Sequence, residues 1–112
     1  MYRIYKAFLY SLAGLKAAFK TEPALRQEVY ICIILIPLAI YVDESMIAKI
    51  ILIQSLILVI IAELCNSAIE ATIDRISKDI HNLSKKAKDV GSAIVFVAII
   101  NAIICWFLVL YY

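Results

Sequence analysis

Glycine and proline are scarce in this 112-residue chain, which contains two of each. Glycine occurs only at Gly14 and Gly91, so the chain has no glycine-rich phosphate loop, and the Walker and protein-kinase nucleotide motifs are excluded. The three cysteines lie in apolar sequence at spacings that fit no metal or redox motif, and we interpret them as buried small hydrophobic residues. The net charge is only +2, which gives little support to nucleic-acid binding.

Apolar residues dominate the chain instead. They make up 65% of it, whereas a soluble domain is about half apolar. We therefore predict an all-α membrane protein that forms a single membrane domain over residues 1–112. A span needs about 20 residues. The last apolar run, 93–112, meets this length outright, the second meets it when extended through Glu63, and the first meets it only if its helix begins near Ala24. We expect an N-terminal interfacial helix over 2–20, helices that include the membrane spans over 24–42, 46–74 and 92–112, and a cytoplasmic connector over 77–91.

The N-terminal segment is expected to be a basic amphipathic helix. Phe8, Leu12 and Leu15 fall on its apolar side, and Lys6 and Lys16 lie largely off that side. A helix of this kind lies in the membrane interface with its cations toward anionic headgroups, or packs on the cytoplasmic ends of the spans.

Basic residues gather in the N-terminal 27 residues and again after the second span. By the positive-inside rule both regions are cytoplasmic, so we expect the N-terminus inside and the C-terminus outside. A signal peptide is not expected, because the first apolar run comes late and lacks a small-residue cleavage site. The residues concerned are Arg3, Lys6, Lys16, Lys20 and Arg26, and then Arg75, Lys78, Lys85, Lys86 and Lys88.

A stripe of polar residues ends the second apolar run. On a helix that turns about 100° per residue, its members fall within roughly 80° of one another. Acidic residues near a bilayer are costly, and their default interpretation is functional. Such a face must lie against protein or water rather than lipid, so oligomerisation is also expected. This polar stripe consists of Glu63, Asn66, Glu70 and Asp74.

Carboxylates on one helix face suit a hard cation such as Mg²⁺, with positions left for phosphate oxygens. Glu63 and Glu70 are about 10 Å apart along the helix axis, so one is expected to bind metal while the other acts as a base. The topology places Glu22 and Glu28 at the same membrane depth, with Lys88 just beyond the stripe. These are the parts that phosphoryl transfer needs. Spacing alone indicates a divalent-cation site; it leaves open the phosphate ligand, and also a purely structural polar boundary at Glu63.

The sequence from Glu63 to Asp74 fits the pattern E-x-x-N-[ST]-A-I-E-x-x-x-D. It is followed by H-N-L-S at 81–84 and A-K-D-V-G-S-A at 87–93, and it is preceded by E-P-A-L-R-Q-E at 22–28. In order and spacing these segments closely resemble the prokaryotic diacylglycerol kinase family, to which the first pattern is specific. The resemblance covers nearly the whole chain without gaps.

The resemblance implies a multi-pass enzyme of the inner, cytoplasmic membrane of a prokaryote, assembled as a homotrimer with composite sites on the cytoplasmic side. It would transfer the γ-phosphoryl group of ATP, with Mg²⁺, to the hydroxyl of diacylglycerol, giving phosphatidate. By position, Glu63 matches the general base, and Glu22 and Glu70 match the metal ligands. The other matched positions are Asp74, His81, Lys88 and Asp89 on the nucleotide side, and Arg3, Glu28 and Asn66 near the lipid headgroup and the site.

Four positions depart from the family's pattern. Ser77 stands where glycine is frequent, Asp79 replaces a glutamate, Ile80 replaces an aromatic residue, and Pro23 follows Glu22 where alanine is usual. These departures concern the connector and the start of a helix, so they bear on nucleotide affinity and loop shape more than on the chemistry.

Three alternative functions are considered. A related branch resembles undecaprenol kinase, which uses the same chemistry on a polyprenol, but Asn66-Ser67-Ala68 is more similar to the diacylglycerol branch. A small proton-coupled multidrug exporter would need four spans and a carboxylate deep within a helix. A non-enzymatic membrane subunit would use the polar stripe for assembly only.

Overall fold

The computed structural model describes residues 1–76 and 82–112. They form four helices, α1 (Tyr2–Thr21), α2 (Pro23–Tyr41), α3 (Met46–Ile76) and α4 (Asn82–Tyr111), and no strand occurs in these two ranges. Of the four, α2, α3 and α4 are long and apolar enough to cross a membrane. The predicted all-α fold with three span-length helices is therefore confirmed.

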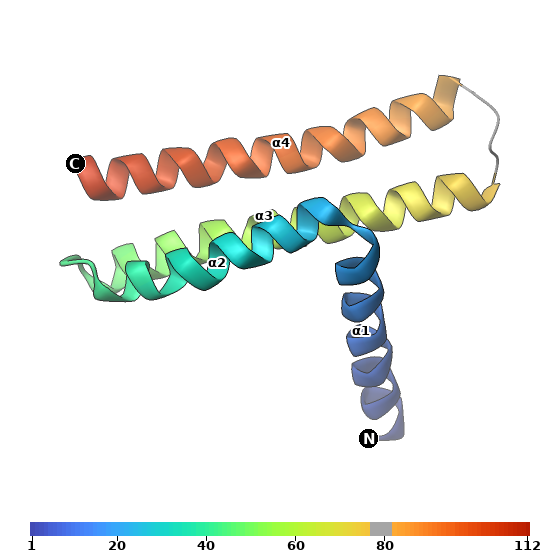
Figure 1. Cartoon of the computed structure of the whole chain (residues 1–112), viewed down its shortest axis with the longest axis horizontal. Helices are drawn as coiled ribbons and strands as arrows, with labels where there is room; N and C mark the ends of the chain where they lie inside the picture. The colour runs from blue at the N-terminus through green and yellow to red at the C-terminus, as the bar shows by residue number, and fades with distance from the viewer. Residues whose placement is uncertain (77–81) are drawn as a thin grey trace.

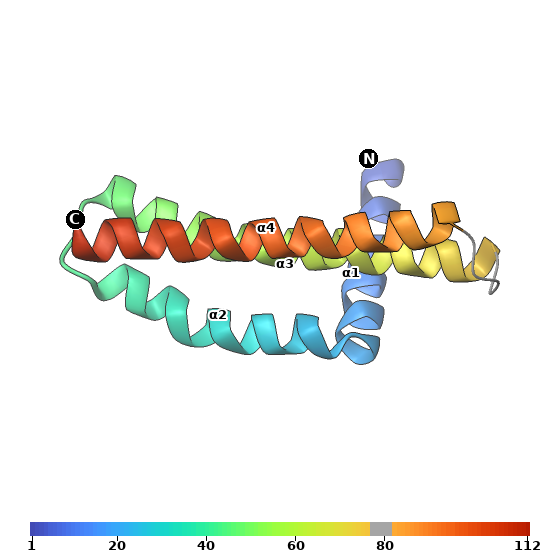
Figure 2. The ribbon, with the colours of Figure 1, turned by 90° about the horizontal axis from the view of Figure 1, so that it is seen from above.

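The central element is α3, on which both α2 and α4 pack. Figure 1 shows α4 running back alongside α3, while α1 projects away from the spans at the start of α2. From above, α4 overlies α3, whereas α2 lies to one side of both helices (Figure 2). The start of α2, the end of α3 and the start of α4 therefore lie toward one end of the bundle. The turn after α2 and the C-terminus lie at the other end (Figure 1).

Small side chains line the seam between α3 and α4. Gly91, Ala98 and Ala102 are buried on α4, and their spacing of seven and then four residues puts them on one helix face. Ala98 and Ala102 pack against Val59 and Ala62 of α3. In lipid, where no hydrophobic effect drives helices together, small residues allow the close approach on which helix packing depends.

Large apolar side chains cover the outside of the spans. Ile33, Phe96 and Ile103 are each more than 60% exposed in the single chain, as expected for side chains that lipid or other subunits cover. The cysteines follow no single pattern: Cys32 is buried, but Cys65 is exposed. The predicted burial is therefore wrong for Cys65, which lies on an outward face of α3.

The helix α4 begins earlier than the sequence indicated. We expected a connector over 77–91, but α4 is already helical from Asn82. Its charged first turns are supported by an ion pair of Lys85 with Asp89, four residues later, at 2.7 Å. Gly91 is a buried position inside this helix. The remainder of the expected connector, 77–81, lies outside the described residues.

The length of α3 determines where the polar stripe lies. Its 31 residues give a length of about 46 Å at 1.5 Å per residue, whereas the hydrocarbon core of a bilayer is about 30 Å thick. The apolar first half of α3 is long enough to fill most of that thickness. The polar second half therefore extends beyond the hydrocarbon, at the end of the bundle where α2 and α4 begin.

Candidate active site

A single extended residue, Glu22, separates α1 from α2. Its backbone has φ −113° and ψ 101°, so it ends α1 and caps the start of α2. Pro23 follows at the first helical position, where its fixed φ favours a new helix. Arg26 then donates hydrogen bonds to the carbonyl oxygens of Phe19 and Lys20, at 2.9 and 2.8 Å. The bend at Glu22, here called the elbow, thus places the Glu22 carboxylate between α1 and α2.

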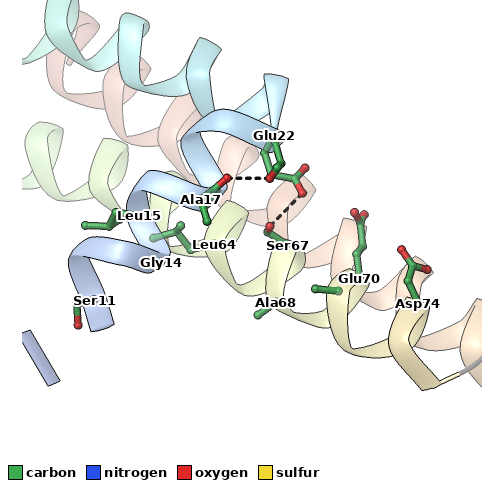
Figure 3. Close-up of a pocket in the computed structure, with 13 residues that line it drawn as sticks. Ser11, Gly14, Leu15, Ala17, Glu22, Leu64, Ser67, Ala68, Glu70 and Asp74 are labelled. Carbon is green, nitrogen blue, oxygen red and sulfur yellow. Dashed lines mark hydrogen bonds between the residues drawn. The ribbon is translucent and has the colours of Figure 1, made fainter. Parts of the chain in front are cut away.

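The elbow is joined to α3 by a hydrogen bond. Ser67 Oγ donates to Glu22 Oε1 at 3.0 Å. Figure 3 shows Glu70 and Asp74 on later turns of α3, projecting to the side on which Glu22 lies. Two segments that are 45 residues apart in the sequence thus present their carboxylates together.

An open groove lies between α1 and α3 (Figure 3). Its volume is about 750 Å³, and three carboxylates reach it, together with small side chains of α1 and α3. The groove is large enough for several phosphate groups and a metal ion. The part of its lining away from the carboxylates is apolar. Its lining consists of Ser11, Gly14, Leu15, Ala17, Ala18, Thr21, Glu22, Leu64, Ser67, Ala68, Glu70, Ala71 and Asp74.

Within the stripe, Asn66 is linked to Glu70. Its Nδ2 donates to Glu70 Oε1 at 3.3 Å, between partly buried side chains. Its Oδ1 is buried and accepts no hydrogen bond from any residue that the structure describes. The Asn66 carboxamide therefore orients the Glu70 carboxylate through one of its two polar atoms.

Lys88 brings a positive charge from α4 to the stripe. Its Nζ lies 2.6 Å from Asp74 Oδ1, and it also interacts electrostatically with Glu70. At the end of the stripe nearer the apolar half of α3, Glu63 is partly buried and lies within electrostatic range of Glu28, Glu22 and Glu70. The predicted site residues thus include one connected group of charged side chains, to which Asn66 is joined through Glu70. The group consists of Glu22, Glu28, Glu63, Glu70, Asp74 and Lys88.

Two predicted site residues are not part of this group, and a third is not among the described residues. Arg3 is exposed, and it belongs to the end of α1 that points away from the spans (Figure 1). Asp89 pairs with Lys85 on an exposed part of α4, away from the groove. His81 lies outside the described residues.

The donors in the groove fit a Mg²⁺ ion that arrives with a phosphate ligand. Among residues 1–76 and 82–112, no three His, Cys, Asp or Glu side chains converge as a complete metal site. Mg²⁺ does not need one, because it commonly uses one or two carboxylates and completes its shell with phosphate oxygens and water. Glu22 and Glu70 line the same groove and supply carboxylates of this kind.

Three residues of the site carried too weak a signal to be predicted. Ser67 was assigned no role, yet it donates a hydrogen bond to Glu22. Arg26 had been assigned to topology, yet it caps the end of α1. Gly91 was the last residue of the expected connector over 77–91, yet it packs against Asn66. The roles of Ser67 and Gly91 depend on contacts between distant segments, which the order of the sequence does not reveal. The role of Arg26 depends on the bend between α1 and α2.

Comparison with known proteins supports a single family. A family model described as prokaryotic diacylglycerol kinase matches residues 9–110. The diacylglycerol kinase of Escherichia coli K12 is 47% identical over 109 residues, covering 97% of this chain and 89% of the relative. That of Pseudomonas aeruginosa is 49% identical, covering 93% and 85%, and that of Haemophilus influenzae is 50% identical, covering 87% and 82%. The chain therefore belongs to the prokaryotic diacylglycerol kinase family.

Proposed function

We propose that this protein is an ATP-dependent diacylglycerol kinase, which converts diacylglycerol to phosphatidate at the membrane surface. The observation that carries the proposal is the groove that Glu22, Glu70 and Asp74 share, in a chain whose family match covers residues 9–110. Phosphoryl transfer requires little covalent chemistry from the protein, because positioning and charge stabilisation supply most of the catalysis. Carboxylates and a lysine at one end of a membrane bundle provide both.

Glu22 and Glu70 are the proposed ligands of Mg²⁺. When bound, the ion would supply positive charge to offset the charge on the phosphate groups of ATP. Each carboxylate accepts a hydrogen bond from a neutral side chain, Glu22 from Ser67 and Glu70 from Asn66. Such supporting hydrogen bonds orient metal ligands, so they favour a geometry that is ready for the nucleotide.

Glu63 is the proposed general base. It lies nearer the apolar half of α3 than Glu70 does, which is the side from which a lipid hydroxyl would arrive. The hydroxyl oxygen attacks the γ-phosphorus while its proton passes to the Glu63 carboxylate. The bond from the γ-phosphorus to the bridging oxygen breaks, and ADP leaves with that oxygen.

The remaining polar residues are assigned by charge and by depth. Lys88 would compensate phosphate charge, with Asp74, His81 and Asp89 on the nucleotide side. Arg3 and Glu28 are assigned to the region of the lipid headgroup. Because Arg3 and Asp89 lie apart from the groove in the single chain, neighbouring subunits of a homotrimer are proposed to complete the site.

In the proposed setting, the protein lies in the inner membrane of a prokaryote. The N-terminus and the site face the cytoplasm, α1 lies in the interface as an amphipathic helix, and the C-terminus is outside. Three span-length helices support this arrangement over the four-span exporter. Labelling a cysteine added after Tyr112 with an impermeant reagent tests it, since four spans would return the C-terminus to the cytoplasm.

Phosphate transfer tests the function directly. The purified protein in mixed micelles receives MgATP together with diacylglycerol and undecaprenol, and the labelled lipid products are separated. We expect phosphatidate, with turnover lost in Glu63→Gln and kept in Glu44→Gln, which changes the same group in the turn at the other end of the spans. A preference for undecaprenol would reassign the acceptor. No transfer to either lipid by the folded oligomer would reject the kinase.

A further inference from the structure

Among the residues that the structure describes, one buried side-chain atom of the site has no hydrogen-bond partner. Asn66 Oδ1 is shielded from solvent and accepts no hydrogen bond within the described parts of the chain, although Nδ2 of the same side chain donates to Glu70. A buried amide oxygen without a donor is unfavourable and needs an explanation. On α4, the residue that faces this oxygen is Gly91.

Gly91 faces this oxygen. A Cβ atom at position 91 would overlap Asn66 Oδ1, whereas its next contacts, with Asn66 Cγ at 3.5 Å and Ile69 Cδ1 at 3.6 Å, would be ordinary ones. Gly91 has no positive φ and lies inside regular helix. Backbone freedom therefore does not account for glycine at this position. Glycine is instead required here because the Asn66 carboxamide occupies the space that a side chain at position 91 would fill.

We propose that Gly91 is a positioning residue of the active site, and that the space it leaves holds the Asn66 carboxamide with Nδ2 toward Glu70. The inference rests on the proposed function, in which Glu70 binds the metal. Without the carboxamide in this position, the Glu70 carboxylate loses its only hydrogen bond to a side chain among the described residues. It is then free to turn away from the groove.

The predicted effect of a methyl group at position 91 is local. The atom that it overlaps is the end of a side chain, which rotates more easily than two helices separate. Alanine also favours helix more than glycine does, so Gly91→Ala should fold at least as well as the wild type. The stability of Gly91→Ala should therefore equal or exceed that of the wild type, while its activity falls.

Kinetics with the full chain in mixed micelles form the first test. We expect Gly91→Ala to raise the Mg²⁺ concentration for half-maximal activity by about tenfold or more, as loss of a supporting contact to a metal ligand does elsewhere. Ala98→Ser is the matched control, because it adds one heavy atom to the same seam far from Asn66. An equal loss in Ala98→Ser would attribute the effect to general helix packing and overturn the proposal.

The coupling between the two residues can be measured separately. In an Asn66→Ala background the methyl group at position 91 meets no carboxamide, so Gly91→Ala should change the Mg²⁺ requirement by less than about twofold further. Losses that multiply independently would mean that Gly91 does not act through Asn66.

A spectroscopic readout separates this inference from the kinase assignment. The chain contains three asparagines, Asn66, Asn82 and Asn101, so ¹⁵N-asparagine labelling gives three side-chain amide signals, and Asn66→Ala identifies the one from Asn66. That signal should shift in Gly91→Ala and stay in place in Ala98→Ser. If it stays in place in both, the positioning role is wrong. If it shifts although the wild type transfers no phosphate, the positioning role stands and only the proposed function fails.

Discussion

Lys88 Nζ lies 2.6 Å from Asp74 Oδ1, so the first turns of α4 are joined to the last turns of α3. Both side chains remain largely exposed, at 43% and 62%. Exposed ion pairs add little to stability. The pair is therefore better understood as holding a positive charge beside the acidic groove than as holding the helices together.

Replacing Lys88 with methionine should affect nucleotide binding more than folding. We expect the unfolding temperature to change by no more than a few degrees, because a pair this exposed contributes little. The KM for ATP should rise by about tenfold, the loss expected for a contact of about 1.4 kcal/mol to phosphate. Steady-state kinetics at saturating lipid measure this. Lys86→Met removes the same charge two residues earlier, and an equal rise there would show that only net charge matters.

Glu63 and Glu70 should fail in different ways when each becomes glutamine. Glu63→Gln removes the proposed base, which would act only in the transition state, so kcat should fall by about 10²-fold or more while ATP still binds. Glu70→Gln removes a proposed metal ligand, so Mg²⁺-dependent nucleotide affinity should fall as well. Nucleotide titration of both variants alongside turnover separates the two roles. Near-normal turnover in Glu63→Gln would remove the base assignment.

Ser67→Ala should weaken the proposed metal site without changing a carboxylate. The variant loses the 3.0 Å hydrogen bond to Glu22, and a hydrogen bond to a charged group contributes about 1.5–3 kcal/mol. We expect the Mg²⁺ requirement to rise by about tenfold, measured by activity at fixed ATP. Ser67→Thr keeps the hydroxyl and should stay within about threefold of the wild type. If both variants behave alike, the hydroxyl does not orient Glu22.

Trp106→Phe should destabilise the bundle and spare the chemistry. Trp106 Nε1 donates to the Leu52 carbonyl oxygen at 3.3 Å and to Ser55 Oγ at 3.2 Å, which ties α4 to α3 far from the groove. Hydrogen bonds between membrane helices contribute about 0.6 kcal/mol on average and up to about 1.7. Unfolding in mixed detergent should show a loss in this range, with kcat unchanged. Ser55→Ala leaves the carbonyl acceptor and should lose less.

The helical class and the three spans were predictable because they depend on local patterns. A long apolar run is a helix in lipid whatever packs on it, since every backbone group must be satisfied within the segment. The common face of Glu63, Asn66 and Glu70 likewise follows from helix periodicity alone.

Contacts between helices were beyond prediction from one sequence. Glu22 and Ser67 are 45 residues apart, and nothing near either residue indicates the other. The start of α4 was missed because its first turns are charged, which is typical of a connector. The Lys85–Asp89 pair and the packing of Gly91 on Asn66 are instead compatible with a continuous helix.

The elbow at Glu22 has a mechanical consequence. Only one extended residue separates α1 from α2, so any change in the tilt of α1 must be taken up largely by the backbone torsions of that residue. The same residue carries a carboxylate that faces the groove. A bilayer that fixes how α1 lies on its surface would thereby also fix where this carboxylate points. The headgroup layer would then help to position the active site. Replacing the bilayer with detergent would change the orientation of the Glu22 carboxylate before that of the other site residues.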